Sequence, residues 1–206
     1  MITGAELFVK ALKAEGVNTL FAYPGGQAID LFDALYGEKE IDVILPRHEQ
    51  GLIHAADGYA RSTGRVGVCL VTSGPGAANL VTGIATANFD SVPLVCFTGQ
   101  VPTSLIGNDA FQEVDIVGIT RSICKYAVTV RKREELGDII KKAFVIAKAG
   151  RPGVVVVDLP KDIQKEYGSG CYPESVEIRG CRQVTGAHAG QVRRAMEALK
   201  QAKRPL

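Results

Sequence analysis

The sequence predicts an α/β fold in which a doubly wound, six-stranded parallel sheet carries helices on both faces. Short runs rich in β-branched residues alternate with helical stretches or Gly-rich turns along most of the chain. Some of these runs, such as VGVCLVT and GVVVVDLP, are apolar almost throughout, as in strands that are covered on both faces. With 206 residues, of which 46% are hydrophobic and 22% charged, the chain is large enough to bury the core of one full domain.

The first expected element is an amino-terminal helix. Thr3 and Glu6 have the spacing of a capping box, and apolar residues between Ala5 and Leu12 mark one face of the helix. The six expected strands follow at residues 18–23, 41–46, 66–72, 93–98, 126–130 and 153–160. Ligands of such sheets bind outside the carboxyl ends of the strands, so we expect functional residues directly after these runs.

The alternation stops near residue 164, which sets the predicted domain boundaries. Residues 1–165 form the predicted sheet domain, and residues 166–184, with turn formers but no periodicity, are a predicted linker. Residues 185–206 are the predicted start of a further, truncated domain, with Thr185 capping a helix that contains Ala195, Leu199 and Ala202. We therefore expect the sequence to be part of a longer polypeptide.

Composition excludes several classes of function. Lys and Arg number 24 against 22 Asp and Glu, which provides no electrostatic reason to expect a nucleic acid or a membrane as partner. No apolar run approaches the roughly 20 residues of a membrane helix, and the amino terminus is amphipathic rather than a signal peptide. We expect a cytoplasmic protein whose five cysteines are reduced, with Cys69 and Cys96 acting as small apolar residues in strands.

A carboxylate lies where the predicted sheet would bind a ligand. Residues 41–46 lead into His48 and Glu49, and a helix follows, so Glu49 is expected at the carboxyl end of a strand. Partial desolvation there suits a group that shares a proton at neutral pH. A structural role explains the position of Glu49 equally simply, because a glutamate in the first turn of a helix complements the helix dipole. His48 and His54 have no third ligand at metal-site spacing, so we predict no metal site among these residues.

A Gly-rich turn follows the strand expected at residues 66–72. Gly74 and Gly76 form G-x-G, but Pro75 lies between them and Asn79 stands where a dinucleotide fingerprint has its third glycine. Close packing of helix on strand explains this turn as well as a ligand contact does.

Two further segments follow strands and are candidates for ligand contacts. The sequence YPGG, after the first strand, allows a backbone amide to approach a ligand closely, or forms a structural turn. The segment GQVPTSLIGNDAFQE is a long loop that contains Phe111 and Gln112, and long ordered loops at this edge of a sheet are often functional.

Six segments together resemble one family. The chain contains, in order and at similar spacing, YPGG, RHEQGLIHAADGYAR, VTSGPGAANLVTGIATA, GQVP, DAFQEVDIVGITR and GRPGVVVVDLPKDI. These resemble the N-terminal thiamine diphosphate pyrimidine-binding domain of acetolactate (acetohydroxyacid) synthase large subunits. The similarity covers Thr3 to Ile163; RHE is typical of the wider thiamine diphosphate superfamily, whereas DAFQE and DLPKD are typical of the synthases.

The resemblance implies roles for individual residues. Glu49 matches the glutamate that hydrogen-bonds the aminopyrimidine of the cofactor and favours its imino tautomer, and Gly26 matches a glycine whose backbone lies near the reacting oxygen. The remaining matches are predicted to contact the pyrimidine (Tyr23, Pro75 and Asn79), a flavin (Arg151) and the substrate channel (Phe111, Gln112 and Lys161). Gln27 departs from the family, which often has alanine there, so substrate access and cofactor fit could differ.

The family decarboxylates pyruvate and condenses the two-carbon unit with pyruvate or 2-ketobutyrate in branched-chain amino acid biosynthesis. The implied cofactors are thiamine diphosphate, FAD and Mg²⁺, with the metal bound by a C-terminal domain outside this sequence, so the 206 residues alone are expected to be inactive. The implied partners are a second copy, as homodimer or homotetramer, and a regulatory small subunit.

Three alternatives stay open. The first is a flavin-free, catabolic acetolactate synthase, although DAFQE favours the flavin-containing type. The second is another thiamine diphosphate carboligase or acetyltransferase, and the third is a non-catalytic cofactor-binding module. Pyruvate decarboxylase-like enzymes are disfavoured, because their paired-histidine motif is absent from the loop after the fourth strand.

Overall fold

The computed structural model describes residues 1–180 and 186–205 and confirms the predicted fold class. A parallel sheet contains, in spatial order, β3 (Asp42–Ile44), β2 (Thr19–Ala22), β4 (Gly67–Val71), β5 (Leu94–Gln100), β7 (Val154–Pro160) and β6 (Tyr126–Thr129). These are the six runs that the sequence predicted as strands. All pairs of neighbouring strands in this sheet are parallel, so their carboxyl ends share one edge.

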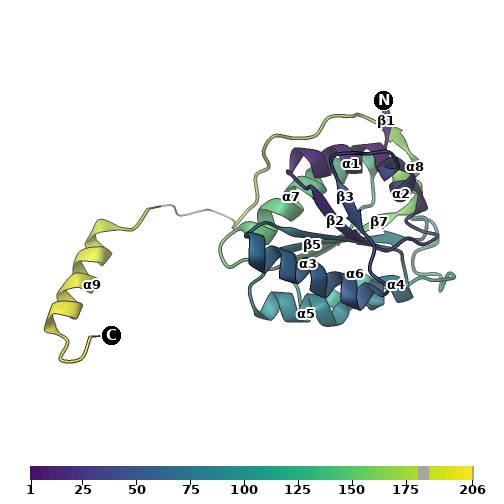
Figure 1. Cartoon of the computed structure of the whole chain (residues 1–206). Helices are drawn as coiled ribbons and strands as arrows, with labels where there is room; N and C mark the ends of the chain where they lie inside the picture. The colour runs from purple at the N-terminus through teal and green to yellow at the C-terminus, as the bar shows by residue number, and fades with distance from the viewer. Residues whose placement is uncertain (181–185, 206) are drawn as a thin grey trace.

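Helices cover both faces of the sheet (Figure 1). One face packs against α1 (Gly4–Ala14), α2 (Ile29–Leu35), α7 (Leu136–Lys148) and α8 (Lys161–Lys165). The other packs against α3 (Glu49–Thr63), α4 (Pro75–Ala78), α5 (Val81–Phe89) and α6 (Ile116–Thr120). A 3₁₀ turn, η1 (Arg133–Glu135), leads into α7.

Local sequence signals explain how the first helix forms and packs. Thr3 Oγ1 accepts a hydrogen bond from the Glu6 N–H at 3.1 Å, and Glu6 Oε2 accepts one from the Thr3 N–H at 2.7 Å, which confirms the predicted capping box. From α1, Phe8 reaches the sheet and meets Phe97 edge to face, with ring centroids 4.9 Å apart.

The strand cysteines are part of the core, as predicted. Cys69 and Cys96 are register partners in β4 and β5, and neither is exposed. Burial raises the pKa of the Cys69 thiol well above its usual range, which makes it unreactive. Cys181 lies outside the described residues.

The chain after α8 is attached to the sheet domain over its first residues. β8 (Tyr167–Gly168) pairs antiparallel with β1 (Ile2–Thr3). The buried Arg133 guanidinium donates hydrogen bonds to the backbone carbonyls of both segments, namely Ile2, Thr3, Glu166 and Ser169. The beginning of the predicted linker therefore packs on the domain that precedes it.

The expected C-terminal helix is present as α9 (Ala189–Gln201), which buries none of its residues (Figure 1). The predicted cap residue, Thr185, lies outside the described residues. The domain boundaries at 165 and 184 stay a prediction. Within residues 1–180 and 186–205, no helix combines the length and apolar character needed to cross a membrane.

Candidate functional site

The carboxyl edge of the parallel sheet carries the predicted carboxylate. Glu49 is the first residue of α3, and the helix begins there because His48 adopts an extended conformation and its Nδ1 accepts a hydrogen bond from the Gln50 N–H at 3.1 Å. Glu49 is partly buried, and the first turn of a helix favours a negative charge. The structure thus places a carboxylate at the edge where ligands of such sheets bind.

Asn79 fixes the orientation of this carboxylate. Its Nδ2 donates to Glu49 Oε2 at 2.9 Å, so two candidate residues that are 30 positions apart in sequence meet. The other oxygen, Oε1, points toward Gly76, where a Cβ atom would lie 3.3 Å away. The same Cβ would lie 2.8 Å from Thr72 Cγ2, so glycine permits close packing here, and Oε1 accepts no hydrogen bond from the described residues.

The Gly-rich turn before α4 is shaped by a contact between two backbones. Gly74 has φ 60° and ψ −122°, a conformation that strongly favours glycine. A Cβ on Gly74 would lie 2.5 Å from the Gln112 carbonyl oxygen, so the glycine admits the backbone of the following long loop. Pro75 occupies the first position of α4 and is exposed at this edge. Close packing therefore explains both glycines, Gly74 against the Gln112 backbone and Gly76 against the Thr72 side chain.

The loop between β5 and α6, residues 101–115, holds Phe111 and Gln112 above the sheet edge. Its amides bond to carboxylates: the Thr103 N–H donates to both oxygens of Asp162 at 3.1 Å, and the Ala110 N–H donates to Glu113 at 2.9 Å. Phe111 is 85% exposed, so its ring is free to contact a ligand or another protein chain. The loop is long but is held by hydrogen bonds within it and to α8.

The segment 23–27 lies beside the SGPG turn. The Tyr23 N–H donates to the Leu70 carbonyl at 2.9 Å, which continues the pairing of β2 with β4 beyond the strand. Tyr23 packs against the apolar cluster on the α3 side of the sheet. Lys161, at the start of α8, donates to the Gly26 carbonyl at 2.5 Å, so the structure brings this predicted channel lysine to the loop that follows β2.

Arg151 is separated from these residues. It precedes β7 and donates to Ser91 Oγ at 2.6 Å and to the Phe89 carbonyl at 2.8 Å, in the segment that precedes β5. Because the strands are parallel, this is the amino edge of the sheet, opposite the edge that carries Glu49. The structure therefore does not join Arg151 to the other candidates, and its flavin contact stays a prediction.

Comparisons with known proteins agree with this geometry. The profile of the family described as thiamine pyrophosphate enzyme, N-terminal TPP binding domain, matches residues 2–119. The chain belongs to the thiamine pyrophosphate enzymes. The matched region contains Glu49, Asn79, Phe111 and Gln112 and ends before Arg151.

Curated relatives of this thiamine pyrophosphate enzyme are large subunits of acetolactate synthases. The chain is 53% identical to acetolactate synthase isozyme 3 large subunit of Escherichia coli (strain K12), a match that covers 100% of the chain and 36% of the relative. It is 51% identical to acetolactate synthase large subunit of Haemophilus influenzae, with 100% and 36% coverage. It is 50% identical to a probable acetolactate synthase large subunit of Methanocaldococcus jannaschii, with 98% and 35% coverage. The chain spans about a third of the length of these relatives.

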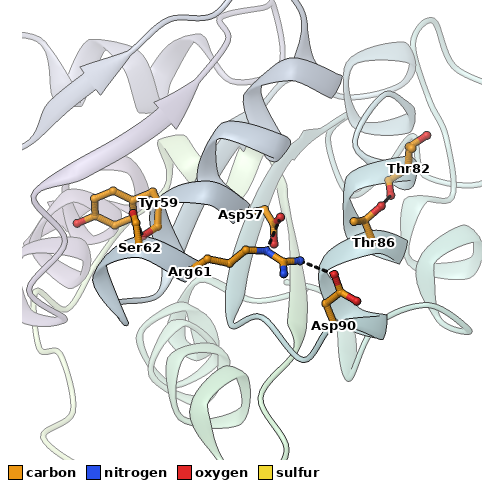
Figure 2. Close-up of polar contacts among 7 residues, drawn as sticks. All are labelled: Asp57, Tyr59, Arg61, Ser62, Thr82, Thr86 and Asp90. Atoms are coloured by element: carbon orange, nitrogen blue, oxygen red, sulfur yellow. Dashed lines mark hydrogen bonds and ion pairs between the residues drawn. The ribbon is translucent and has the colours of Figure 1, made fainter.

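A network on α3, remote from the carboxyl edge, fixes the helix that begins with Glu49. Figure 2 shows Arg61 between two carboxylates: its Nε donates to Asp57 Oδ2 at 2.9 Å and its Nη2 to Asp90 Oδ2 at 2.6 Å. Asp90 caps the carboxyl end of α5, so the guanidinium links α3 to α5. The network therefore connects the helix whose first residue is Glu49 to the end of α5.

Sequence reasoning missed three residues that organise this edge. Thr72 Oγ1 accepts a hydrogen bond from the Gln27 N–H at 3.2 Å, and Gln164 Nε2 donates to the Gln27 carbonyl at 2.8 Å. Asp158, near the end of β7, is 1% exposed, and burial raises its pKa to about 6 despite hydrogen bonds that lower it. Thr72 directly follows a strand, a signal that could have identified it. Gln164 follows the DLPKD motif without a signal of its own.

Proposed function

We propose that the chain is the N-terminal, pyrimidine-binding part of an acetolactate synthase. The observation that carries the proposal is the carboxylate of Glu49 at the carboxyl edge of the sheet, which Asn79 holds by Oε2 while Oε1 accepts no hydrogen bond from the described residues. This arrangement fits a planar aminopyrimidine that shares a hydrogen with Oε1. The relatives named acetolactate synthase large subunit support the choice among thiamine pyrophosphate enzymes.

The residues of this chain would bind and orient the cofactor and control one proton. When bound, thiamine diphosphate supplies the carbanion stabilisation that the reaction needs. Glu49 Oε1 would hold the proton shared with the pyrimidine ring, and Asn79 would keep the carboxylate in position. Tyr23 and Pro75 would line the pyrimidine pocket, and the Gly26 amide would face the reacting oxygen as an electrostatic contact.

The substrates in this proposal are pyruvate and, as second acceptor, pyruvate or 2-ketobutyrate, for the synthesis of branched-chain amino acids in the cytoplasm. Phe111, Gln112 and Lys161 would border the substrate channel, and Arg151 would contact FAD at the other edge of the sheet. The magnesium- and diphosphate-binding residues would come from sequence outside these 206 residues, so we expect the chain alone to be inactive.

We also propose that the protein works as a homodimer or homotetramer, with a regulatory small subunit as a further partner. The edge strand β3 supports self-association: Val43 is 40% and Ile44 44% exposed, and Leu45, which follows, is 60% exposed. Exposed apolar residues gathered on an edge strand are typical of surfaces that another chain covers.

The experiment that tests the function is acetolactate formation from pyruvate by the full-length gene product, with thiamine diphosphate and Mg²⁺, and with or without FAD. Glu49→Gln is expected to lower kcat by about 100-fold or more, since it removes the group that controls the proton. Glu135→Gln is the matched control, because Glu135 is exposed and lies in η1, at the amino-terminal end of α7. Activity that does not need FAD would favour the catabolic alternative, and no acetolactate at all would refute the function.

A further inference from the structure

Four of the six backbone polar groups between Gly25 and Gln27 form hydrogen bonds. The Gly25 carbonyl accepts from the Ala28 N–H at 2.9 Å, and the Gly26 carbonyl accepts from Lys161 Nζ at 2.5 Å. The Gln27 N–H donates to Thr72 Oγ1, and the Gln27 carbonyl accepts from Gln164 Nε2. Within the described part of the chain, the N–H groups of Gly25 and Gly26 have no acceptor, and of these two residues Gly26 is the exposed one.

Two of these bonds come from α8, a helix more than 130 residues away in sequence. Lys161 Nζ also lies 3.3 Å from Asp30 Oδ2, at the start of α2. Its ammonium group is therefore held between the Gly26 carbonyl, to which it donates a hydrogen bond, and the Asp30 carboxylate, with which it forms an ion pair. The lysine thus links the loop that carries Gly26 to α8 and to the start of α2.

Gln164 is built into this arrangement with one possible orientation. Its Nε2 donates to the carbonyls of Gln27 at 2.8 Å and Leu159 at 2.7 Å, and two carbonyls can be satisfied only by an amide nitrogen. The residue is 2% exposed, and its Oε1 is buried without a hydrogen-bond partner. An unsatisfied buried acceptor is unfavourable, so burial of a polar side chain here needs a reason beyond packing. A glutamine is explained if its amide nitrogen holds the Gln27 and Leu159 carbonyls in place.

Two close contacts of glycine backbone further restrict segment 25–27, and we call these contacts, together with the bonds from Lys161, Gln164 and Thr72, the clamp. A Cβ on Gly25 would lie 2.5 Å from the Thr72 side chain, and a Cβ on Gly99 would overlap the Gln27 carbonyl oxygen. The loop therefore rests directly on the ends of β4 and β5. Bonds from α8 on one side and Thr72 on the other leave the peptide units little freedom to rotate.

We propose that Lys161 and Gln164 are positioning residues that hold segment 25–27 from α8, so that the Gly26 N–H is presented as a preorganised donor at the carboxyl edge. The catalytic consequence rests on the function proposed above; the ordering of the loop does not. A preorganised donor stabilises developing negative charge without reorganisation during the reaction, so disorder in the loop lowers kcat more than it weakens substrate binding.

The test compares Gln164→Leu and Lys161→Met with Lys165→Met in the full-length gene product. Lys165 is on the same helix and is 60% exposed, and its Nζ lies 3.9 Å from Asp30 Oδ1 without contacting the loop. Hydrogen exchange of the amides of Gln27 and Ala28, measured by mass spectrometry, reports the order of the loop. We expect Gln164→Leu and Lys161→Met to speed this exchange by about tenfold or more, since local opening sets protection.

In the same variants we expect kcat for acetolactate formation to fall by about 10- to 100-fold. This decrease is smaller than the one expected when an oxyanion donor is removed outright. We expect KM for pyruvate to change by less than about 3-fold. Lys165→Met should change neither quantity. Gln164→Leu removes an unsatisfied acceptor, but it also removes the donor to the Gln27 and Leu159 carbonyls, so the unfolding midpoint is measured for each variant. A midpoint near that of the wild type separates positioning from misfolding. Unchanged exchange in both variants overturns the proposal. A raised KM with normal kcat in Lys161→Met also overturns it, because that result indicates direct substrate contact. If the wild type makes no acetolactate, the exchange result still decides whether the clamp exists.

Discussion

Replacing Asp158 with asparagine should remove a specific part of the pH dependence of stability. Asp158 lies between its register partners Thr98 and Thr129 on β5 and β6. Its Oδ1 accepts from Thr98 Oγ1 at 2.7 Å, and its Oδ2 accepts from Thr129 Oγ1 and Gln100 Nε2 at 3.1 Å each. Burial raises its pKa from 3.8 to about 6, because desolvation outweighs these hydrogen bonds and the nearby charge of Arg131.

The sign of the effect follows from the folded chain binding this proton more tightly than the unfolded chain. Between about pH 4 and pH 6 the folded protein keeps a proton that the unfolded chain has released, so the free energy of unfolding falls as pH rises through this window. The stabilisation is fully present below pH 3.8 and is lost above about pH 6. A difference of about two pH units, at about 1.4 kcal/mol each, corresponds to about 3 kcal/mol.

The assay is urea unfolding of the wild type and Asp158→Asn, followed by circular dichroism at pH steps from 4 to 7. Exposed carboxylates titrate in both proteins and cancel in the difference between the two free energies of unfolding. We expect the wild type to lose stability relative to the variant by about 3 kcal/mol from pH 4 to pH 7. A difference that stays constant with pH would refute the inference that this buried carboxylate takes up a proton in the folded state.

Two further predictions concern backbone contacts that cross long stretches of sequence. Arg133→Leu leaves four buried or partly buried carbonyls without their shared donor, and we expect the free energy of unfolding to fall by about 2–4 kcal/mol in urea titrations; a change under about 0.5 kcal/mol would show that water replaces the guanidinium. Gly74→Ala forces a side chain into a φ of 60° and against the Gln112 carbonyl, so the variant should lose about 1–3 kcal/mol and exchange the amides of residues 110–113 faster. Normal stability and exchange for this variant would mean that loop and turn separate easily.

The local part of the architecture could be predicted from sequence, because it depends on neighbouring residues. Apolar runs of five to seven residues defined the strands, and Thr3 with Glu6 defined the first helix start. The position of Glu49 followed from one strand and one helix next to each other in the chain. The same reasoning could have separated Arg151 from the other candidates, since it precedes a strand of a parallel sheet and Lys161 follows one.

The tertiary structure alone decided which distant groups meet. The strand order β3-β2-β4-β5-β7-β6 inserts β7 between β5 and β6, and only this order surrounds Asp158 with Thr98 and Thr129. The packing of α8 beside α2 likewise brings Lys161 and Gln164 to the loop after β2. Local propensities are set by a residue and its neighbours along the chain. These contacts depend instead on how whole helices and strands pack together, which no short stretch of sequence specifies.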